Sequence, residues 1–463
     1  MKSERIHRCL SCINYLAILV VTFGLLALPL FAQDQLATID DAFAAVNNEV
    51  PAFGGMFVDD DTDTLYVYLV PGQTGNTAQV DQALSDVLGE GRPREHQIVA
   101  LEGQYTFLQL KRWRGLLSPE VLSIPGAYVA GVDSSKNRLR VGVESMAVIP
   151  AVQAFLATKE IPGDAVNIEV ISAPMIVSTA GAEDDTGASP DDAADEKTLR
   201  SYFRPVVGGL QIEVAFPGLQ NANTCTLGFV ATLNGAPGIV TNDHCKKDYT
   251  VPKMNLFYQP EVADANKFAT GKLFPDYFRQ NQNPKCTDEH RHCRYSDTCF
   301  ATLDKKDSGS RGMIARPAAG SDQWNGTDTF NIVGRAAQGK QLQGKSVTRV
   351  SSQTGRDTGG IGEDNTGKID YTCQDMQQWE QPAGGGRKRD TLITMLCQVQ
   401  VKWKGAVKQG DSGSPVFITN DGNNDVEVVG ILWGDTGVSP MDNILMTTEM
   451  GPTLDVCIPG KKC

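Results

Sequence analysis

Hydrophobic residues follow two different periods between Asp34 and about Ile171. Behind Asp34, a candidate helix cap, apolar residues recur at helical spacing: Leu36, Ile39, Phe43 and Val46. Farther on, apolar residues alternate with polar ones, as in a half-buried strand: Leu65, Val67 and Leu69. Helices and strands in one short region predict a small α+β unit.

The same pattern returns at an offset of 74 residues. Val58-Asp59 with the alternating Leu65, Val67 and Leu69 recurs as Val132-Asp133 with Leu139, Val141 and Val143. Each copy predicts a strand, a polar turn and a second strand. A helical pattern follows each copy: Val80, Leu84, Val87 and Leu88 in the first, and Val148, Val152 and Phe155 in the second. Residues 33–178 are therefore predicted to hold two related modules.

The chain changes character at residues 179–199. Seven acidic residues come before the first basic one, among Gly, Pro and small residues, without apolar periodicity. Such a composition does not bury a core, and it predicts a flexible, protease-accessible linker. If the segment is merely a solvated loop, the domain boundary stays the same.

Residues 200–463 are rich in strand patterns and poor in helical ones. The apolar runs, several of them separated by Asn, Gly, Pro or Asp turns, are Val206–Phe216, Cys225–Leu233, Ile239–Thr241, Pro415–Thr419 and Val426–Trp433. This half is predicted to be an all-β barrel or sandwich.

Residues 1–32 have the features of an export signal. A basic start (Lys2, Arg5, Arg8) precedes an apolar stretch from Ile13 to Phe31 and a small-residue site near Ala32. The alternative is an uncleaved membrane anchor, because the apolar run approaches the length that a bilayer requires. Both readings place the body of the protein outside the cytoplasm.

The charge distribution argues against one function class. The 463 residues carry a formal net charge of −13, but residues 200–463 hold 29 Lys and Arg against 28 Asp and Glu. The acidity thus belongs to the first half, and the second half has no basic excess. Nucleic-acid binding is not expected.

Cysteine usage fits export. Of eleven cysteines, all but Cys9 and Cys12 lie at or after Cys225, so disulfides are expected only in the second half. Without the signal nine remain, and one thiol is expected outside the bridges. The simplest terminal and insertion bridges are Cys457 with Cys463 and Cys373 with Cys397. Cys286, His290, His292, Cys293 and Cys299 could instead hold zinc, but disulfides within this loop are favoured in an exported chain.

Two short motifs carry candidate chemistry. His244 ends a strand in Thr-Asn-Asp-His-Cys, and a bridge between Cys225 and Cys245 would clamp that strand next to the ring, as a general base requires. Ser412 lies in Gly410-Asp-Ser-Gly-Ser-Pro directly before an apolar strand. The glycines permit a tight turn that exposes the hydroxyl and leaves N–H groups to face an oxyanion.

The two motifs together predict a nucleophilic serine. A serine hydroxyl needs an imidazole to take its proton, and the imidazole needs a buried carboxylate. In the order His, Asp, Ser, the carboxylate lies between the two motifs. Asp297, in Arg-Tyr-Ser-Asp before a short strand-like run, is the prediction, and Asp304 and Asp307 are the alternates.

TNDHC, RYSD and GDSGSP, in this order, resemble the motifs of the chymotrypsin-fold serine peptidases. The whole chain resembles the secreted bacterial branch with long pro-regions, the streptogrisin and α-lytic type. The likeness covers about Val206 to Thr448 through the motifs and, more loosely, Phe53 to Val143. It implies an α+β pro-region followed by an all-β double-barrel domain without cofactor or metal, acting on peptide or protein substrates, with the pro-region as an intramolecular partner.

The resemblance also implies a role for each matching position. Ser412 would attack the peptide carbonyl, His244 would shuttle the proton, Asp297 would orient His244, and the N–H groups of Gly410 and Ser412 would bind the oxyanion. Two segments would wall the substrate pocket: Ala406, Val407 and Lys408 on one side, and Leu432, Trp433 and Gly434 on the other. Without a carboxylate at Ala406, an uncharged side chain is favoured before the cleaved bond, although Asp435 could reach the rim.

The sequence leaves several structural and functional alternatives open. No cysteine lies between Cys397 and Cys457 to bracket the serine loop, and Asp411 would pair with either Arg349 or Arg356. The first half is either a removable pro-region or an independent binding or anchoring domain. The whole protein is a secreted peptidase or, alternatively, an inactive binding protein on a peptidase scaffold.

Overall fold

The computed structural model describes the chain from Thr38 onward, with gaps. The described residues are 38–92, 97–118, 120–174, 197–215, 222–245, 255–273, 286, 292–304, 312–358, 367–378, 393–419, 424–446, 453–461 and 463. The predicted signal and most of the predicted linker lie outside them. Thr38–Cys463 forms one compact unit, separate from Met1–Ala37.

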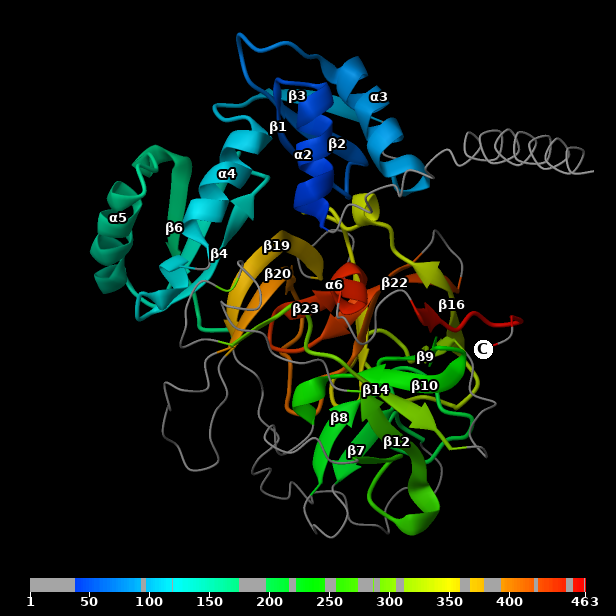
Figure 1. Ribbon diagram of the computed structural model, residues 1–463. Coiled ribbons are helices and arrows are strands. Elements are labelled where there is room, and N and C mark those ends of the chain that lie inside the picture. The colour runs from blue at the N-terminus through cyan, green and yellow to red at the C-terminus, as the bar shows by residue number, and fades with distance from the viewer. Residues whose placement is uncertain are drawn as a thin grey trace, which may run out of the picture. The chain divides into compact units, whose positions relative to one another are not determined.

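The N-terminal region contains two copies of one α+β arrangement (Figure 1). In each copy a helix precedes an antiparallel hairpin, and a second helix leads to a strand that pairs in parallel with the hairpin. The first copy comprises α2 (Ile39–Glu49), β1 (Phe53–Asp59), β2 (Thr64–Leu69), α3 (Thr77–Leu88) and β3 (Gln97–Glu102). The second comprises α4 (Phe107–Leu117), β4 (Ala127–Asp133), β5 (Arg138–Val143), α5 (Ile149–Thr158) and β6 (Val166–Val170).

Helix α2 is capped at Thr38 and not at Asp34, which lies outside the described residues. The Thr38 hydroxyl accepts the Asp41 N–H at 3.2 Å, and the Asp41 carboxylate accepts the Thr38 N–H at 3.0 Å. This reciprocal pair satisfies two N–H groups that the first turn leaves without helical partners. The apolar spacing located the helix, but it did not reveal this local exchange.

The first half of the strand-rich region forms an eight-stranded sheet that curves back toward its starting segment. The Asn223–Leu233 segment bends, so β8 (Asn223–Thr226) pairs with β7 while β9 (Phe229–Leu233) pairs with β10. The sheet therefore returns to the segment where it began. Its other strands are β7 (Gln211–Ala215), β10 (Ala236–Thr241), β11 (Leu256–Tyr258), β12 (Lys267–Leu273) and β14 (Cys299–Leu303), with β24 (Leu454–Val456) beside β9.

A second sheet follows the same principle. Its strands run in the order β17, β21, β22, β23, β20 and β19, and the backbone just before β17 bonds to β19 through Val347 N–H to Gly367 O at 2.8 Å and the Ser346–Lys368 bridge. The strands are β17 (Thr348–Ser351), β19 (Lys368–Gln378), β20 (Ile393–Lys402), β21 (Pro415–Thr419), β22 (Asp425–Leu432) and β23 (Gly437–Pro440). The predicted all-β second half is confirmed as a mostly β domain.

Shorter elements extend this sheet. Strand β13 pairs with β20, β18 pairs with β17, and β16 joins β15 to β22. Their bounds are β13 (His292–Arg294), β15 (Met313–Ala315), β16 (Thr329–Arg335) and β18 (Gly355–Thr358), and a short helix, α6 (Met441–Met446), follows β23.

Strand pairing also joins the N-terminal region to the second sheet. Strand β4 lies antiparallel to β19, with Ala130 opposite Asp375 and Val129 opposite Met376. The Gln374 side chain donates to Val132 O at 2.9 Å. Backbone pairing therefore continues from one half of the chain into the other.

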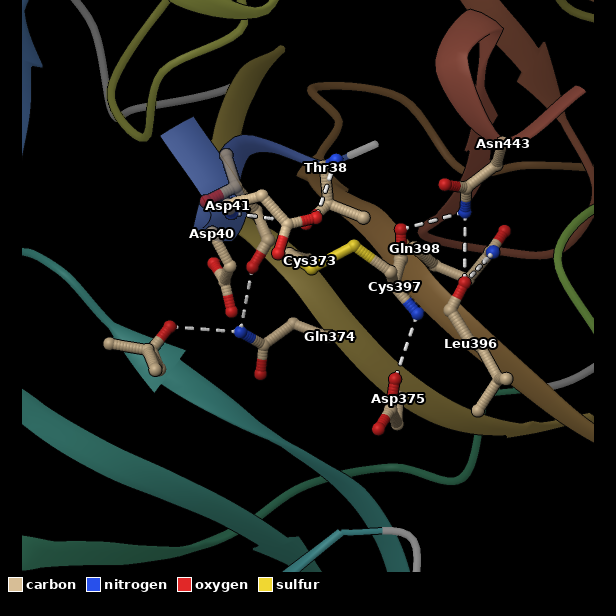
Figure 2. The surroundings of a disulfide bond; sticks show 12 residues. Thr38, Asp40, Asp41, Cys373, Gln374, Asp375, Leu396, Cys397, Gln398 and Asn443 are labelled. Atoms are coloured by element: carbon tan, nitrogen blue, oxygen red, sulfur yellow. Dashed lines mark hydrogen bonds between the residues drawn. A yellow bond between two sulfur atoms is a disulfide. The ribbon is translucent and has the colours of Figure 1, made fainter. Parts of the chain in front are cut away.

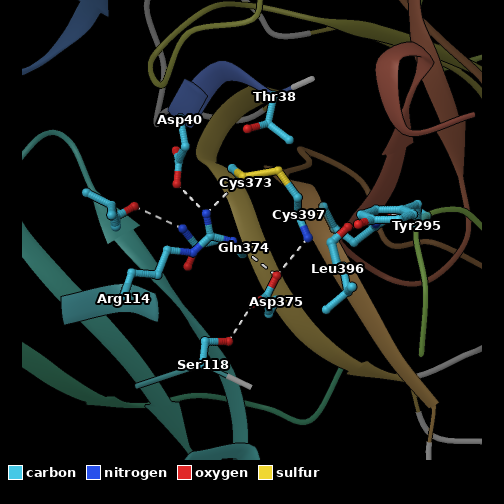
Figure 3. Close-up of polar contacts among 12 residues, drawn as sticks. Thr38, Asp40, Arg114, Ser118, Tyr295, Cys373, Gln374, Asp375, Leu396 and Cys397 are labelled. Atoms are coloured by element: carbon cyan, nitrogen blue, oxygen red, sulfur yellow. Dashed lines mark hydrogen bonds and ion pairs between the residues drawn. A yellow bond between two sulfur atoms is a disulfide. The ribbon is translucent and has the colours of Figure 1, made fainter. Parts of the chain in front are cut away.

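A buried ion-pair network reinforces this junction (Figure 3). Arg114 on α4 pairs with Asp40 on α2 and with Asp375 on β19, whose carboxylate also accepts the Cys397 N–H at 2.8 Å. The disulfide between Cys373 and Cys397 lies beside the network (Figure 2). Burial raises the pKa of Asp40 although Arg114 opposes that shift. Arg114 thus supplies the positive charge that compensates the burial of two carboxylates.

We predict that Arg114→Met lowers the free energy of unfolding by about 3–5 kcal/mol, because it leaves Asp40 and Asp375 buried without their cation. Urea unfolding of the full chain measures the loss. Arg112→Met, at an exposed position on the same helix, is the matched control and should change stability by no more than about 0.5 kcal/mol. Equal stability of the two variants would contradict the assignment.

Candidate active site

His244 lies in a short 3-10 turn, Asp243–Cys245, that follows β10. Two contacts hold this turn: a disulfide joins Cys245 to Cys225 on β8, and the Asn223 side chain donates to Cys245 O at 3.1 Å. The ring is buried, with 4% of the residue exposed. The turn that carries the imidazole is therefore fixed to β8 by a disulfide and a hydrogen bond.

Asp297 is the carboxylate that faces His244. Its Oδ2 pairs with His244 Nδ1, and its Oδ1 accepts the His244 N–H at 3.1 Å. The Asp297 N–H donates to Ser439 Oγ at 3.1 Å, and Asp297 is fully buried between β13 and β14. Of the alternates, Asp304 instead pairs with Lys267 at 3.1 Å, and Asp307 lies outside the described residues.

Ser412 lies in a tight loop between two glycines at positive φ, Gly410 (93°) and Gly413 (92°). Its carbonyl accepts the Thr226 N–H at 2.8 Å, and the Gly413 N–H donates to Leu432 O at 2.9 Å. Within the described part of the chain, the N–H groups of Gly410 and Ser412 have no acceptor. The serine loop therefore has two N–H groups that can donate to a substrate oxygen.

The structure brings the serine loop to the strands that carry the histidine. Ser412 bonds to Thr226 on β8, and the Thr241 hydroxyl, at the end of β10, donates to Thr226 O at 2.8 Å. It does not place Ser412 Oγ in a hydrogen bond with His244: among the described residues, the buried His244 Nε2 has no partner. His244 and Asp297 are therefore paired, but the hydrogen bond between Ser412 Oγ and His244 Nε2 is not formed.

A buried arginine holds the aspartate of the serine loop. Arg349 Nη1 lies 3.4 Å from Asp411 Oδ2, and the Asp411 carboxylate accepts the N–H groups of Gln353 at 3.1 Å and Lys408 at 2.9 Å. Burial raises the pKa of Asp411, while Arg349 and these hydrogen bonds oppose the rise. The sequence left Arg349 and Arg356 open, and the structure selects Arg349; Arg356 lies over the Phe330 ring.

The six predicted pocket residues fall in two unlike environments. Leu432, Trp433 and Gly434 are buried, and the Trp433 indole N–H donates to Gln398 Oε1 at 3.0 Å. Ala406 and Lys408 are exposed and Val407 is half-buried against the same core as Leu432. One predicted wall is therefore rigid and apolar, and the other lies at the surface.

Cysteines in the described residues form four disulfides. Besides Cys225–Cys245 and Cys373–Cys397, the structure pairs Cys457 with Cys463 and Cys286 with Cys293. The last pair uses two of the thiols that the zinc alternative needs, and no group of three or more metal-ligating side chains occurs in the described residues. Cys299 is a buried thiol with its Sγ 3.4 Å from Asn242 O.

Sequence reasoning missed three side chains that surround the histidine–aspartate pair: Asp243, Arg294 and Ser439. Asp243 and Arg294 stand inside the two motifs that carry His244 and Asp297, but motif reading assigns them no contact. Ser439, on β23, is 142 residues away from Asp297 in the sequence, and the pairing of both β13 and β23 with β20 brings the two together. No sequence signal marks it.

No family model matches the chain, and no curated protein matches it. Among the described residues, no helix is long and apolar enough to cross a bilayer.

Solved structures that match include Protease A of Thermobifida fusca, at 16% identity and a TM-score of 0.32 over 54% of this chain and 98% of that one. A glutamic acid specific serine protease matches at 15% identity and a TM-score of 0.32, over 54% and 100% of the two chains. An alpha-lytic protease homolog, N4, matches at 15% identity and a TM-score of 0.30, over 51% and 92%.

The serine loop yields a stability prediction. A Cβ at Gly413 would lie 2.2 Å from Thr226 O and 2.3 Å from Thr241 Oγ1. Gly413→Ala should therefore cost about 2 kcal/mol more in urea unfolding than Gly235→Ala, whose Cβ would meet open space at a similarly positive φ of 75°. Equal losses would show that the loop does not pack tightly against β8 and β10.

Proposed function

We propose that this protein is a secreted serine endopeptidase, made as a precursor whose N-terminal region is removed. The observation that supports the proposal most directly is the buried pair of His244 Nδ1 and Asp297 Oδ2, next to a serine loop with two unbonded N–H groups. A buried carboxylate on Nδ1 keeps the proton there, so Nε2 is the atom that accepts one from a serine.

The first half of the reaction forms an acyl-enzyme. Ser412 Oγ attacks the peptide carbonyl carbon while His244 Nε2 takes the hydroxyl proton, and the N–H groups of Gly410 and Ser412 bind the resulting oxyanion. The carbon–nitrogen bond then breaks as His244 gives its proton to the leaving amine. For this step a small movement must bring Ser412 Oγ within hydrogen-bond reach of Nε2, as catalytic hydrogen bonds often tighten only with substrate bound.

The second half restores the enzyme. Water attacks the ester carbon, His244 takes the water proton, and the carbon–Oγ bond breaks as that proton returns to Ser412. The released product is a carboxylic acid. Asp297 stays ionised throughout and stabilises the imidazolium in each half.

The pocket favours an uncharged side chain before the cleaved bond. Its buried wall is apolar, and Ala406, on the opposite wall, offers no carboxylate to an arginine or lysine. Asp435, which follows Gly434 directly, has an oxygen that accepts the Thr436 N–H at 2.9 Å. An apolar or small residue is therefore the proposed preference.

The N-terminal region is proposed to be a pro-region. Its β4 extends the sheet of the second half, and Arg114 anchors it to Asp375. Tyr128 and Val129 pack in one apolar cluster with Trp433, and Ile171 packs against that cluster. This contact holds the first half against a pocket wall, which suits a segment that restricts access until cleavage in the acidic stretch releases it.

One observation favours the alternative, an inactive binding protein on a peptidase scaffold. The His244 Nε2 atom lacks the serine hydrogen bond that a primed peptidase shows. The complete set of Ser, His and Asp, with a formed serine loop, weighs against it. Four disulfides suit an extracellular protein under both readings.

We predict that Ser412→Ala lowers hydrolysis of fluorescein-labelled casein at least about a thousandfold, because no other group can form the acyl ester. The folded state should survive, since the Ser412 side chain makes no hydrogen bond to any residue in the described ranges. Ser414→Ala is the neighbouring control: its hydroxyl bonds to Ser351 at 2.7 Å, so it should lose stability before chemistry. Unchanged hydrolysis by Ser412→Ala would refute the triad.

We also predict that activity falls on the acid side of its pH profile, because the imidazole must be neutral to accept the serine proton. Initial casein hydrolysis rates at constant ionic strength measure the profile. A maximum below about pH 5 would contradict histidine as the base.

A further inference from the structure

Arg294 is a buried guanidinium that lies against two carboxylates at the candidate active site. Its Nη2 is 2.8 Å from Asp297 Oδ1, and its Nη1 is 2.9 Å from Asp243 Oδ2. Only 1% of Arg294 is exposed, and both aspartates are fully buried. The carboxylate that serves His244 through Oδ2 therefore has a fixed cation on its other oxygen.

The fold holds Arg294 in this place. Strand β13 pairs in parallel with β20, with Arg294 opposite Met395, and the Arg294 Nε–H points to Met395 Sδ at 3.2 Å. The preceding residue, Cys293, is bridged to Cys286. Backbone pairing and a disulfide thus fix a side chain whose fork reaches two acids.

Among the described residues, the charges at this site form a small buried set. The turn after β10 contributes Asp243 and His244, β13 contributes Arg294, and the segment before β14 contributes Asp297. The facing strands β20 and β23 contribute the uncharged Met395 and Ser439. With a neutral imidazole the four groups sum to one negative charge. With an imidazolium they sum to zero.

The net charge of these four groups gives the second carboxylate on Arg294 a role. Arg294 with Asp297 alone would be neutral, and an imidazolium formed during catalysis would then lack a net counter-charge. Asp243 restores that charge while still satisfying the second arm of the guanidinium. Buried charges interact strongly because the surrounding medium screens them weakly.

We infer that Arg294 and Asp243 are positioning residues of the proposed peptidase, which fix Asp297 and set the charge that His244 feels. The inference rests on the proposed function. If the pair were merely structural, its removal would lower stability and leave the pH dependence of the surviving activity where it was.

The test measures the rate of fluorophosphonate labelling against pH, since this reaction uses the same serine and the same base and needs no known substrate. Asp243→Asn removes a negative charge, so the acid limb should move down by about one pH unit. Arg294→Met removes a positive charge, so the limb should move up by a similar amount. The double variant has the wild-type net charge, and its limb should return close to the wild-type position with a plateau at least about tenfold lower, because Asp297 loses its orientation.

Two further variants complete the design. Arg294→Lys keeps the positive charge but can reach only one of the two carboxylates, so its plateau labelling rate should lie between those of Arg294→Met and wild type. If Arg294→Met does not fold, Arg294→Lys and Asp243→Asn are the variants that test the inference. Lys340→Met removes a cation from an ion pair with Glu427 (2.8 Å) and should leave the limb unchanged. The inference would be overturned if the acid limbs of Asp243→Asn and Arg294→Met moved in the same direction, or if neither limb moved.

The same assay separates the two levels of the account. If wild type is not labelled at Ser412, the proposed function fails and the inference fails with it. If wild type is labelled at Ser412 and the limbs of the charge variants do not move, only the inference fails.

Discussion

The candidate site depends on one constraint: the carboxylate of Asp297 is fully buried, with none of the residue exposed to solvent. Burying an unpaired carboxylate costs several kcal/mol, so its surroundings must supply donors and charge. His244 and Arg294 supply these on its two oxygens, and Ser439 holds its backbone. The Cys225–Cys245 bridge holds the turn that carries His244, and the pairing of β13 with β20 places Arg294.

The same constraint appears at the junction between the two halves of the chain. Asp40 and Asp375 share Arg114, as Asp243 and Asp297 share Arg294. At the junction the shared cation holds one element against another. At the site it binds the carboxylate that pairs with His244. A shared buried arginine therefore does not by itself indicate catalysis; its neighbours decide.

Much of this was readable from the sequence because periodicity and short motifs are local signals. The repeat offset of 74 residues matches the spacing of β1 and β2 to β4 and β5, and GDSG, with its flanking glycines, predicts the tight serine loop. These partners could not be predicted, because Arg294 faces Asp243 only after β13 joins β20, and Ser439 reaches Asp297 only after β23 joins β20. Arg349 was separable from Arg356 only in three dimensions.

The most direct test of the central claim is to treat the folded chain with a fluorophosphonate and locate the adduct by peptide mass spectrometry. The account predicts one adduct per molecule, on Ser412, and none when the chain is unfolded in urea beforehand, because reactivity depends on the assembled histidine and oxyanion donors. A correctly folded chain without an adduct, or with its adduct on another residue, would contradict it.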